Sequence, residues 1–489
     1  MTTKVHQKKS IGYWINSIIC LALLFGFGYL EPWGSLEPVG MKVLGIFLGM
    51  LYGWTFIGFI WPSLLGAVAL GFSGYATVPE VISSGMGNIT VTVFVLFLFI
   101  MAGYVDKVGL TTWIANWFIS RRIAINRPWV LSFLIFLCVY ILGAAVSVFA
   151  AIFLLWSIFY KMCDITGYKP FEKYTVFMLV GIVFSSTLGF AVFPFKAVQI
   201  TALNALATAS NGAVVVNEGA FTVLNIIMSL IVLILYLLVG KFILRPDISR
   251  LKNRGDMFEH LRGQKLTRDQ KIAFVFLIYF FFAMFAPSIF STDHGIGWFF
   301  NSLGQAGSLL LGLGVLAMVR VDGKSPINFD DAAHSIQWDI IVMFIATMPI
   351  SSAMSSSDVG VMSFIVDAVR PFFGGLSPMV FSIAFILIMA ILTQFTHNLV
   401  LAAMVPGILY GFCVEFGMDG STIGLMMTLF TFAISIAIAT PGGSTMSALI
   451  FANTQWIHMK SAYLYTFVAA LISIVVNIAV GFPVGSLLF

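Results

Sequence analysis

Long apolar stretches constrain the fold of this chain more than any other feature. Residues 226–238, 272–284 and 464–480 are almost entirely hydrophobic, in a sequence of 489 residues that is 60% hydrophobic and only 9% charged. A water-soluble domain needs a more highly charged surface, whereas a helix of about 20 apolar residues crosses a lipid bilayer. The sequence therefore predicts an all-α polytopic membrane protein surrounded by membrane lipid.

The first apolar segment, residues 11–30, follows Lys4, Lys8 and Lys9 as the core of a signal peptide would. It leads into Glu-Pro-Trp at residues 31–33 and has no small-residue cleavage site. We therefore expect a retained helix with a cytoplasmic N-terminus.

A basic linker separates two long apolar blocks. Its lysines and arginines are Lys241, Arg245, Arg250, Lys252, Arg254, Arg262, Lys265, Arg268 and Lys271. The positive-inside rule places such a linker in the cytoplasm. Interspersed acidic residues favour this topology signal over a patch that binds anionic lipid or nucleic acid, so no nucleic-acid partner is expected.

An even number of spans must precede a cytoplasmic linker when the N-terminus is also cytoplasmic. We predict about 11 transmembrane helices, six before the linker and five after it, in the plasma membrane with the C-terminus outside. The predicted spans are 13–30, 39–53, 55–73, 91–108, 174–195, 221–244, 272–290, 297–319, 339–355, 423–440 and 461–488.

Two further segments, residues 128–160 and 378–410, are longer than one span needs at about 1.5 Å per residue. Each has small or polar residues midway, around Ser147 in the first and from Thr393 to Asn398 in the second. They are predicted to be re-entrant hairpins, because non-helical backbone at membrane depth needs protein or water partners. One long, kinked and tilted helix is the alternative for each.

The chain also repeats itself. Residues 108–114 resemble residues 359–365, and the same offset (360 − 109 = 251) carries Ser147 onto Asn398. An odd number of spans per repeat requires the two halves to be inverted, as in many secondary transporters, which bind substrate at the midplane. The predicted organisation is an N-terminal tail and helix (1–35), a first repeat (36–244), a cytoplasmic linker (245–271) and a second repeat (272–489).

Several motifs resemble those of the divalent anion:sodium symporter family, which carries dicarboxylates, citrate and sulfate. Residues 84–88 read Ser-Gly-Met-Gly-Asn, 328–333 Asn-Phe-Asp-Asp-Ala-Ala, 336–341 Ile-Gln-Trp-Asp-Ile-Ile, 393–398 Thr-Gln-Phe-Thr-His-Asn and 439–444 Ala-Thr-Pro-Gly-Gly-Ser. The similarity extends from about residue 36 to the C-terminus. It implies a homodimer in which each protomer has a fixed scaffold domain and a mobile transport domain that contains both hairpins and works as an elevator.

The chain departs from this family at its two Ser-Asn-Thr tips, which bind carboxylate and help to form the sodium sites. They are replaced by Val-Ser-Val at 146–148 and Thr-His-Asn at 396–398. Near the first unwound loop, residues 193–196 read Phe-Pro-Phe-Lys where the family has Thr-Pro-Pro-Asn. A basic side chain is thought to replace the cation in exchangers of this family. Obligatory sodium coupling is therefore not expected.

An anion transporter needs hydrogen-bond donors and positive potential, which hairpin tips and broken helices supply through their helix N-termini. The predicted substrate-binding residues are Ser147, Ser186, Thr187, Lys196, Thr396, His397, Asn398, Thr440, Gly442, Gly443 and Ser444. Sodium, the one ion considered as a cofactor, is assigned to Asn398 and Ala439.

Alternative interpretations of individual residues stay open. Lys196 can snorkel to an interface, and His397 can pack as a neutral ring. Ser186 and Thr187 can donate hydrogen bonds to carbonyls of their own helix.

The predicted function is secondary active transport of a small di- or tricarboxylate-like organic anion by an elevator mechanism. Exchange, or proton-coupled transport of sulfate or a monocarboxylate, is the alternative, and an anion channel is less consistent with the repeat. An enzyme is not expected, because the sequence contains no HExxH or GxSxG motif. Its four cysteines are scattered and suggest neither a disulfide framework nor a metal cluster.

Overall fold

The computed structural model describes residues 11–34, 36–252, 258–321, 323–356, 358–373 and 375–489, and these residues are almost entirely helical. Within these ranges, eleven helices are long and apolar enough to cross a membrane. The only strand-like pairing among them is an isolated bridge between Val321 and Lys324. The predicted all-α polytopic fold with about 11 spans is therefore confirmed. The tail of residues 1–10, with Lys4, Lys8 and Lys9, lies outside the described residues.

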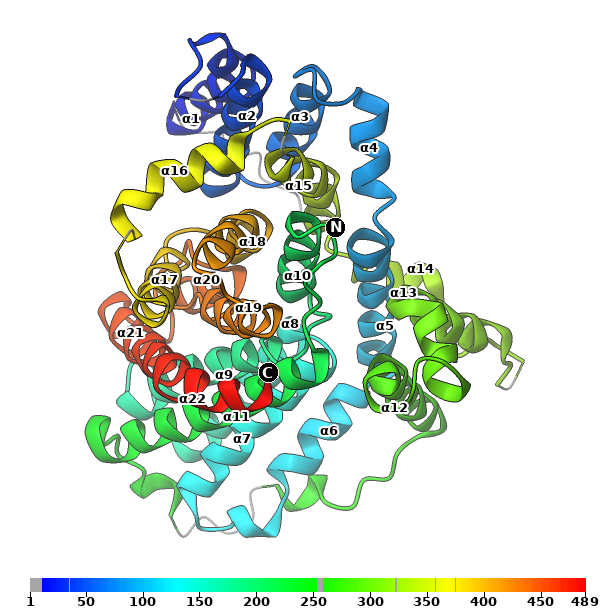
Figure 1. Cartoon of the computed structure of the whole chain (residues 1–489). Helices are drawn as coiled ribbons and strands as arrows, with labels where there is room; N and C mark the ends of the chain where they lie inside the picture. The colour runs from blue at the N-terminus through cyan, green and yellow to red at the C-terminus, as the bar shows by residue number, and fades with distance from the viewer. Residues whose placement is uncertain (1–10, 35, 253–257, 322, 357, 374) are drawn as a thin grey trace.

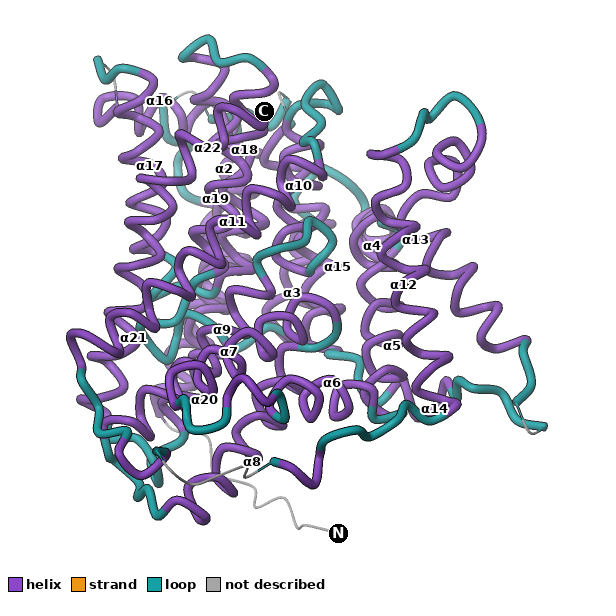
Figure 2. Tube along the Cα trace, turned by 90° about the horizontal axis from the view of Figure 1, so that it is seen from below, coloured by secondary structure: helices purple, strands orange, loops and turns teal. Residues whose placement is uncertain are grey.

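Helices lie close to each predicted span, but the eleven span-length helices are a different set, because they include 128–145, 148–166 and 398–415 from the predicted hairpins, whereas 60–71 and 420–435 are shorter. Before the linker the helices at the predicted spans are α1 (Ile11–Leu21, continued by η1 Ala22–Gly26 and η2 Phe27–Tyr29), α2 (Pro38–Phe56), α3 (Ile60–Gly71), α5 (Phe94–Lys107), α9 (Lys173–Phe190) and α11 (Glu218–Val239, continued by η5 Gly240–Leu244). After the linker they are α12 (Arg268–Ile289), α13 (Gly295–Met318), α15 (Trp338–Ser355), α19 (Gly420–Ser435) and α21 (Met459–Val476, continued by η8 Asn477–Gly481 and α22 Phe482–Leu488). In Figure 2 the long helices run roughly parallel, as spans of one membrane do.

The first long segment forms a helical hairpin of α7 (Pro128–Ala145) and α8 (Val148–Thr166). The Ser132 hydroxyl, near the start of α7, lies 2.9 Å from the Tyr174 hydroxyl. Phe159, near the end of α8, packs against the same tyrosine with ring centroids 6.1 Å apart. The outer ends of both helices therefore meet, so the two helices are antiparallel. α8 extends past the predicted end at Tyr160 because the chain turns only at Gly167, whose φ of 77° suits glycine.

The second long segment forms an equivalent hairpin of α17 (Pro378–Leu392) and α18 (Asn398–Glu415). Phe381, near the start of α17, packs against Phe412 and Phe416, around the end of α18, with centroids 5.5 and 4.7 Å apart. These helices are thus also antiparallel. α18 likewise ends beyond the predicted Tyr410, before a left-handed glycine at position 417.

Two of the predicted spans are interrupted by non-helical segments. After α9, the chain unwinds at residues 191–196 and continues as α10 (Ala197–Ala209), and after α19 it unwinds at 436–444 and continues as α20 (Thr445–Ala452). The Gln199 amide nitrogen donates to the Ser435 hydroxyl over 2.8 Å, so the two interrupted spans pack against each other. The predicted spans ended at 195 and 440 and did not include α10 or α20.

Shorter helices complete the chain. They are α4 (Val78–Met86), η3 (Ile89–Val93), α6 (Leu110–Ile119), η4 (Arg122–Ala124), η6 (Ser249–Leu251), η7 (Glu259–Leu261), α14 (Phe329–Ala333) and α16 (Val361–Phe373). α6 and α16 each precede a hairpin, and their first residues are 361 − 110 = 251 positions apart. The order span, short helix, hairpin, interrupted span and final span thus occurs twice, with the offset seen in the sequence. The inverted relation of the halves stays a prediction.

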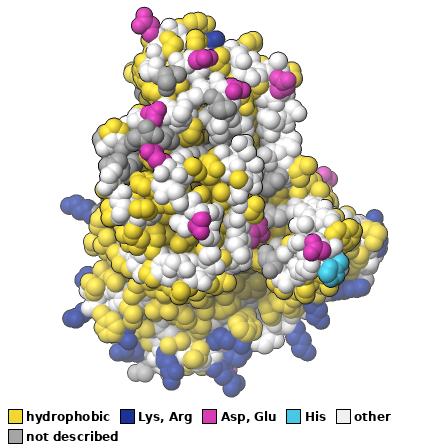
Figure 3. Space-filling view, in the orientation of Figure 1, with side chains coloured by type: hydrophobic (Ala, Val, Ile, Leu, Met, Phe, Trp, Pro, Cys, Tyr) yellow, Lys and Arg dark blue, Asp and Glu magenta, His cyan; other side chains and the backbone are white. Residues whose placement is uncertain are grey.

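Figure 1 shows the two hairpins and the interrupted spans grouped together, with α12 to α14 beside them at the right and α1 to α4 at the top. Charged side chains are unevenly distributed. On the face seen in Figure 3, Asp and Glu side chains are scattered, whereas Lys and Arg gather at the lower rim.

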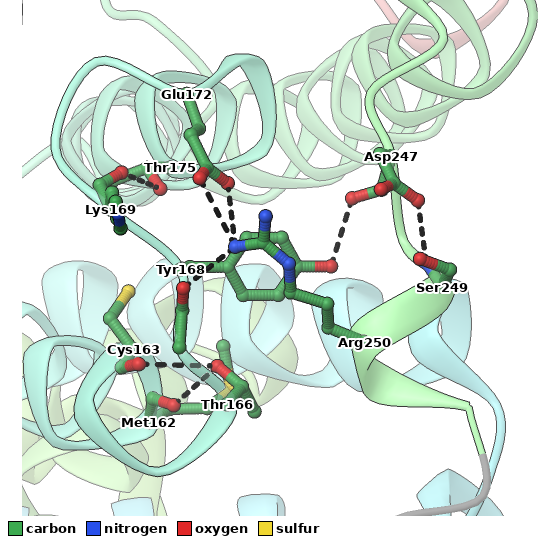
Figure 4. Close-up of polar contacts among 11 residues, drawn as sticks. Met162, Cys163, Thr166, Tyr168, Lys169, Glu172, Thr175, Asp247, Ser249 and Arg250 are labelled. Carbon is green, nitrogen blue, oxygen red and sulfur yellow. Dashed lines mark hydrogen bonds and ion pairs between the residues drawn. The ribbon is translucent and has the colours of Figure 1, made fainter.

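The described part of the linker is fixed at both ends. Arg250 donates from one terminal nitrogen to both carboxylate oxygens of Glu172 (3.1 Å each) and to the Gly167 carbonyl (2.7 Å), in the turn between α8 and α9 (Figure 4). At the other end, the Arg262 Nε donates to the Ser120 carbonyl (3.1 Å) just after α6. The linker therefore connects the base of the first hairpin to the region around α6.

Candidate functional site

The largest group of predicted site residues meets in one cavity of about 150 Å³. The cavity is lined by Phe59, Val95, Leu98, Phe99, Ala102, Gly103, Asp106, Val146, Ser147, Val148, Phe149, Phe190, Lys196, Ala197, Val198, Ser335, Gln337, Asp339, Ile340, His397, Asn398, Leu399, Thr445 and Met446. Both hairpin tips contribute to this lining, as do the first helical residues after the break in each interrupted span. We call this space the central cavity.

Four helices begin at the central cavity. Ser147 caps α8 by accepting a hydrogen bond from the Ala150 N–H (3.4 Å), and His397 caps α18 through Nδ1, which accepts from the Leu399 N–H (3.3 Å). Lys196 is the residue before α10 and makes no side-chain cap, and α20 begins with Thr445. Each helix N-terminus carries a partial positive charge and N–H groups without helical partners. Four such ends around one space make it favourable for an anion.

Lys196 adds a basic side chain to this arrangement. Its side chain is only 6% exposed and lines the central cavity. Among the described residues, no carboxylate lies within ion-pair distance of it. A buried cation without a counter-charge is unfavourable, so the lysine lacks a partner that an anionic ligand would provide.

His397 and Asn398 form the tip of the second hairpin. The His397 ring packs edge-on against Phe59 with centroids 4.7 Å apart, and its Nε2 is buried without a hydrogen-bond partner in the described structure. Asn398, the first residue of α18, is 2% exposed and also lines the cavity. The tip thus presents an imidazole nitrogen and a carboxamide beside the N-terminus of α18.

The central cavity has an apolar wall and a polar rim. Phe59, Phe99, Phe149 and Phe190 are among the apolar residues of the wall. The rim includes Asp106, Ser335, Gln337 and Asp339, from the end of α5 and the start of α15. The short helix α14 directly precedes α15 and contacts α5. Figure 2 places α14 on the side of the molecule opposite the C-terminus. The cavity therefore extends from the hairpin tips toward that side.

The sequence pattern of a family described as citrate transporter matches residues 46–430. The chain belongs to the citrate transporter family. It is thus a membrane transporter and not an enzyme, and family membership supports an anionic substrate. The narrower resemblance to sodium symporters stays an expectation. A sequence search of curated proteins finds no match.

Two solved structures have a fold similar to that of this protein. The YdaH transporter of Alcanivorax borkumensis aligns with a TM-score of 0.60 and 13% identity over 98% of both chains. MtrF of Neisseria gonorrhoeae, described as illuminating a class of antimetabolite efflux pumps, aligns with a TM-score of 0.53 and 12% identity over 97% of this chain and 95% of its own. At such low identity the likeness concerns the fold alone.

Two predicted ligands, Ser186 and Thr187, are absent from the described cavity lining. Ser186 is fully buried and donates from Oγ to the Val148 carbonyl (3.1 Å) at the first hairpin tip. Thr187 donates to the Val183 carbonyl of its own helix (3.0 Å). In this conformation Ser186 positions the tip. Thr187 donates to a carbonyl of its own helix, as the alternative interpretation of this residue expected. Their role as ligands stays a prediction.

The second interrupted span is held by Gln394, at the end of the second hairpin's first helix. Its Nε2 donates to the carbonyls of Ala390 (2.9 Å) and Ile436 (3.0 Å), and its Oε1 accepts from the N–H groups of Ile438 (3.0 Å) and Ala439 (2.9 Å). Sequence reasoning noted Gln394 but gave it no role. Its position beside a predicted chain break was the available signal, since broken helices need side-chain partners.

The other predicted residues of this region also bond to the backbone. Thr440 Oγ1 donates to the Gln394 carbonyl, and Ser444 Oγ donates to the Ala437 carbonyl (2.6 Å). A Cβ on Gly443 would lie 3.0 Å from the Thr393 carbonyl oxygen, so glycine permits this close approach. Gly442 and Thr396 lie outside the described cavity lining. These residues support the tip, and substrate contact by them stays a prediction.

Sequence reasoning missed the polar rim and Phe59. Asp339 belongs to a motif already noted for its family resemblance, and Asp106 precedes the repeated segment 108–114, so both had a signal. Phe59 had none, because only the tertiary structure brings it to His397. Among the described residues, no cluster of three or more His, Cys, Asp or Glu side chains is arranged to bind a metal. The sodium assignment to Asn398 and Ala439 stays a prediction.

Proposed function

We propose that this protein is a secondary active transporter that moves a small organic anion, of the di- or tricarboxylate type, by an elevator mechanism. The observation that carries the proposal is the convergence of four helix N-termini and the unpaired Lys196 on one cavity. Several positive groups suit a substrate with more than one carboxylate. Membership of the citrate transporter family supports the same substrate class.

The proposed orientation follows from the basic linker. Gln270, near the start of α12, donates to the Gly109 carbonyl just after α5, so the linker and the rim of the central cavity lie on one side. The positive-inside rule makes this side cytoplasmic and the C-terminus external. The central cavity then extends toward the cytoplasm, which corresponds to an inward-facing state.

In this proposal the hairpins, the interrupted spans and the two final spans, α11 and α21, form the moving transport domain, and the remaining spans form a scaffold. Substrate leaves toward the cytoplasm past Asp106 and Asp339, whose negative charge disfavours a second anion at the rim. The empty site leaves Lys196 without a counter-charge, so exchange for another anion is favoured over return of the empty site. A homodimer is proposed on the family resemblance alone.

A second candidate is proton-coupled transport, favoured by the buried, unpartnered Nε2 of His397 at the tip. Protonation of this ring would add a charge beside the anion. A sodium ion in the central cavity is not proposed, because a cation next to Lys196 meets like-charge repulsion in a poorly screening environment.

The test is counterflow in proteoliposomes. Vesicles loaded with unlabelled citrate, succinate or sulfate are diluted into a trace of labelled citrate, in choline medium and then with sodium or a pH gradient. The proposal expects saturable, transient accumulation that depends on an internal anion. A non-saturable leak without counterflow would indicate a channel, and absence of transport for every anion would refute the proposal.

A further inference from the structure

A second cavity, of about 420 Å³, lies on another side of α10. It is lined by Ile89, Pro194, Ile200, Leu203, Asn204, Ala207, Val214, Val215, Val216, Glu218, Leu303, Gly304, Gln305 and Ala306. We call it the outer cavity, because Glu218 starts α11, whose other end leads into the basic linker. It lies between the proposed moving part, α10 and α11, and the neighbouring span α13.

Glu218 is the only titratable residue in the described lining of the outer cavity. Its Oε1 accepts a hydrogen bond from Gln305 Nε2 over 2.7 Å, which joins α11 to α13. The oxygen of the same amide, Gln305 Oε1, is buried and has no partner among the described residues. A carboxylate and an unsatisfied carbonyl oxygen therefore lie together, and no Lys, Arg or His of the described residues forms an ion pair with this carboxylate.

The backbone of α13 is interrupted at this place. Gly304 has a φ of 63° and a ψ of −179°, which no helical residue adopts and which glycine tolerates best. Such a break interrupts the regular helical hydrogen bonds, and Gly304 itself lines the outer cavity. The outer cavity thus brings the Glu218 carboxylate and the Gln305 amide oxygen to one place, and oxygen atoms are the ligand type that hard cations bind.

Charged groups on neighbouring elements do not supply the missing positive charge. Lys196, at the start of α10, lines the central cavity instead. Asp293 and His294 precede α13, ten or more positions from Gln305, and are exposed. Glu218 is partly buried at the first turn of α11, and a carboxylate that has lost part of its solvation is less favourable in its ionised form unless a proton or a cation neutralises it.

We propose that Glu218 is an exchangeable cation site, neutralised by a proton or an alkali cation that enters from the side opposite the basic linker. The proposal rests on the transport function proposed above, for which it supplies the site of the coupling ion. Because Glu218 and Gln305 belong to parts that must separate in an elevator movement, occupancy of the site controls whether this contact is retained or released. It is distinct from the anion site, since α10 separates the two cavities.

The first test is the thermal stability of the purified full-length protein as a function of pH, in choline, sodium or potassium salts at constant ionic strength. For a proton site, the Tm falls as the pH rises in every salt, because deprotonation leaves a buried charge. For an alkali-cation site, sodium or potassium restores the Tm at high pH while choline does not. Glu218→Gln removes the response, whereas Asp293→Asn, an exposed charge on the same side, retains it.

A Glu218→Gln protein with the wild-type cation response would overturn the proposal, as would a wild-type Tm indifferent to pH and to both alkali cations. If this variant fails to fold, Gln305→Leu keeps the carboxylate and removes only the amide. It is expected to move the midpoint of the response, and an unchanged midpoint contradicts a site shared by these two residues.

The second test separates this inference from the transport proposal. Exchange of labelled for unlabelled anion, with equal pH and cations on both sides, needs no coupling ion and should persist in Glu218→Gln. Accumulation driven by a pH or cation gradient should fall at least tenfold. Equal accumulation by wild type and variant overturns the site. Absence of exchange in the wild type instead refutes the transport function, while the stability test still reports on Glu218.

Discussion

Replacing Lys196 by methionine should weaken anion binding and stabilise the empty protein at the same time. Methionine keeps a similar length and fits the apolar wall, but it removes the charge that lines the central cavity. An elementary charge about 4 Å from a carboxylate contributes about 4 kcal/mol at an effective dielectric constant of about 20. Truncating one partner of a close charge pair costs about 2–5 kcal/mol in measured cases.

The expected loss of about 2–4 kcal/mol corresponds to a Kd for citrate that is about 30 to 1,000 times higher, at about 1.4 kcal/mol per tenfold change. The empty variant should have a higher Tm than the wild type, because a side chain that is 6% exposed no longer buries an unpaired charge. This opposite change in affinity and stability distinguishes a ligand from a residue needed only for folding.

The assay measures citrate affinity by equilibrium binding and Tm by thermal unfolding, on the same purified samples. Lys161→Met serves as the matched control, since Lys161 is exposed on α8 and should change neither quantity. An unchanged Kd in Lys196→Met would remove the lysine from the anion site. A lower Tm would show that the lysine makes a stabilising interaction and refute the unpaired charge.

Three further predictions follow the same contacts. Gln394→Leu leaves two N–H groups and one carbonyl of the second break unpaired, at about 1–3 kcal/mol each. This variant should therefore have a lower Tm and lower transport activity. The control, Gln264→Leu at an exposed position, should lower the Tm less. Asn398→Ala should weaken substrate affinity about 10- to 150-fold, because a lost hydrogen bond to a charged group costs about 1.5–3 kcal/mol. The folded yield should be retained, and an unchanged affinity would show that Asn398 is not part of the site. Hydrogen bonds from Thr422 lower the pKa of Asp419, so this cap stabilises α19 above the usual carboxyl pKa and is lost as the pH falls through the lowered value. Asp419→Asn should therefore flatten the acidic side of the Tm profile, and an unaltered profile would contradict the cap.

The sequence predicted most spans and both hairpins, because apolar runs and polar midpoints are local signals. It did not predict α10, since Gln199 and Asn204 make that helix less apolar than a span. The meeting of Ser147 with His397 and Asn398 was anticipated from the repeat. Contacts that depend on the packing of distant elements, such as Phe59 against His397, have no local signature and were not predictable.

The bonds made by Gln394 also determine how this protein can open. Three hydrogen bonds of the Gln394 side chain and the Thr393 hydroxyl, which donates to the Ile434 carbonyl (2.9 Å), fasten the second hairpin's tip to the interrupted span behind it. Swinging the tip outward like a hinged flap would break most of them, at about 0.5–1.5 kcal/mol net for each. We infer that the second hairpin moves only together with α19 and α20, so a disulfide engineered between the tip and α20 should leave transport intact. The barrier to release is then set by the stationary surface that faces the tip, where Phe59 meets His397.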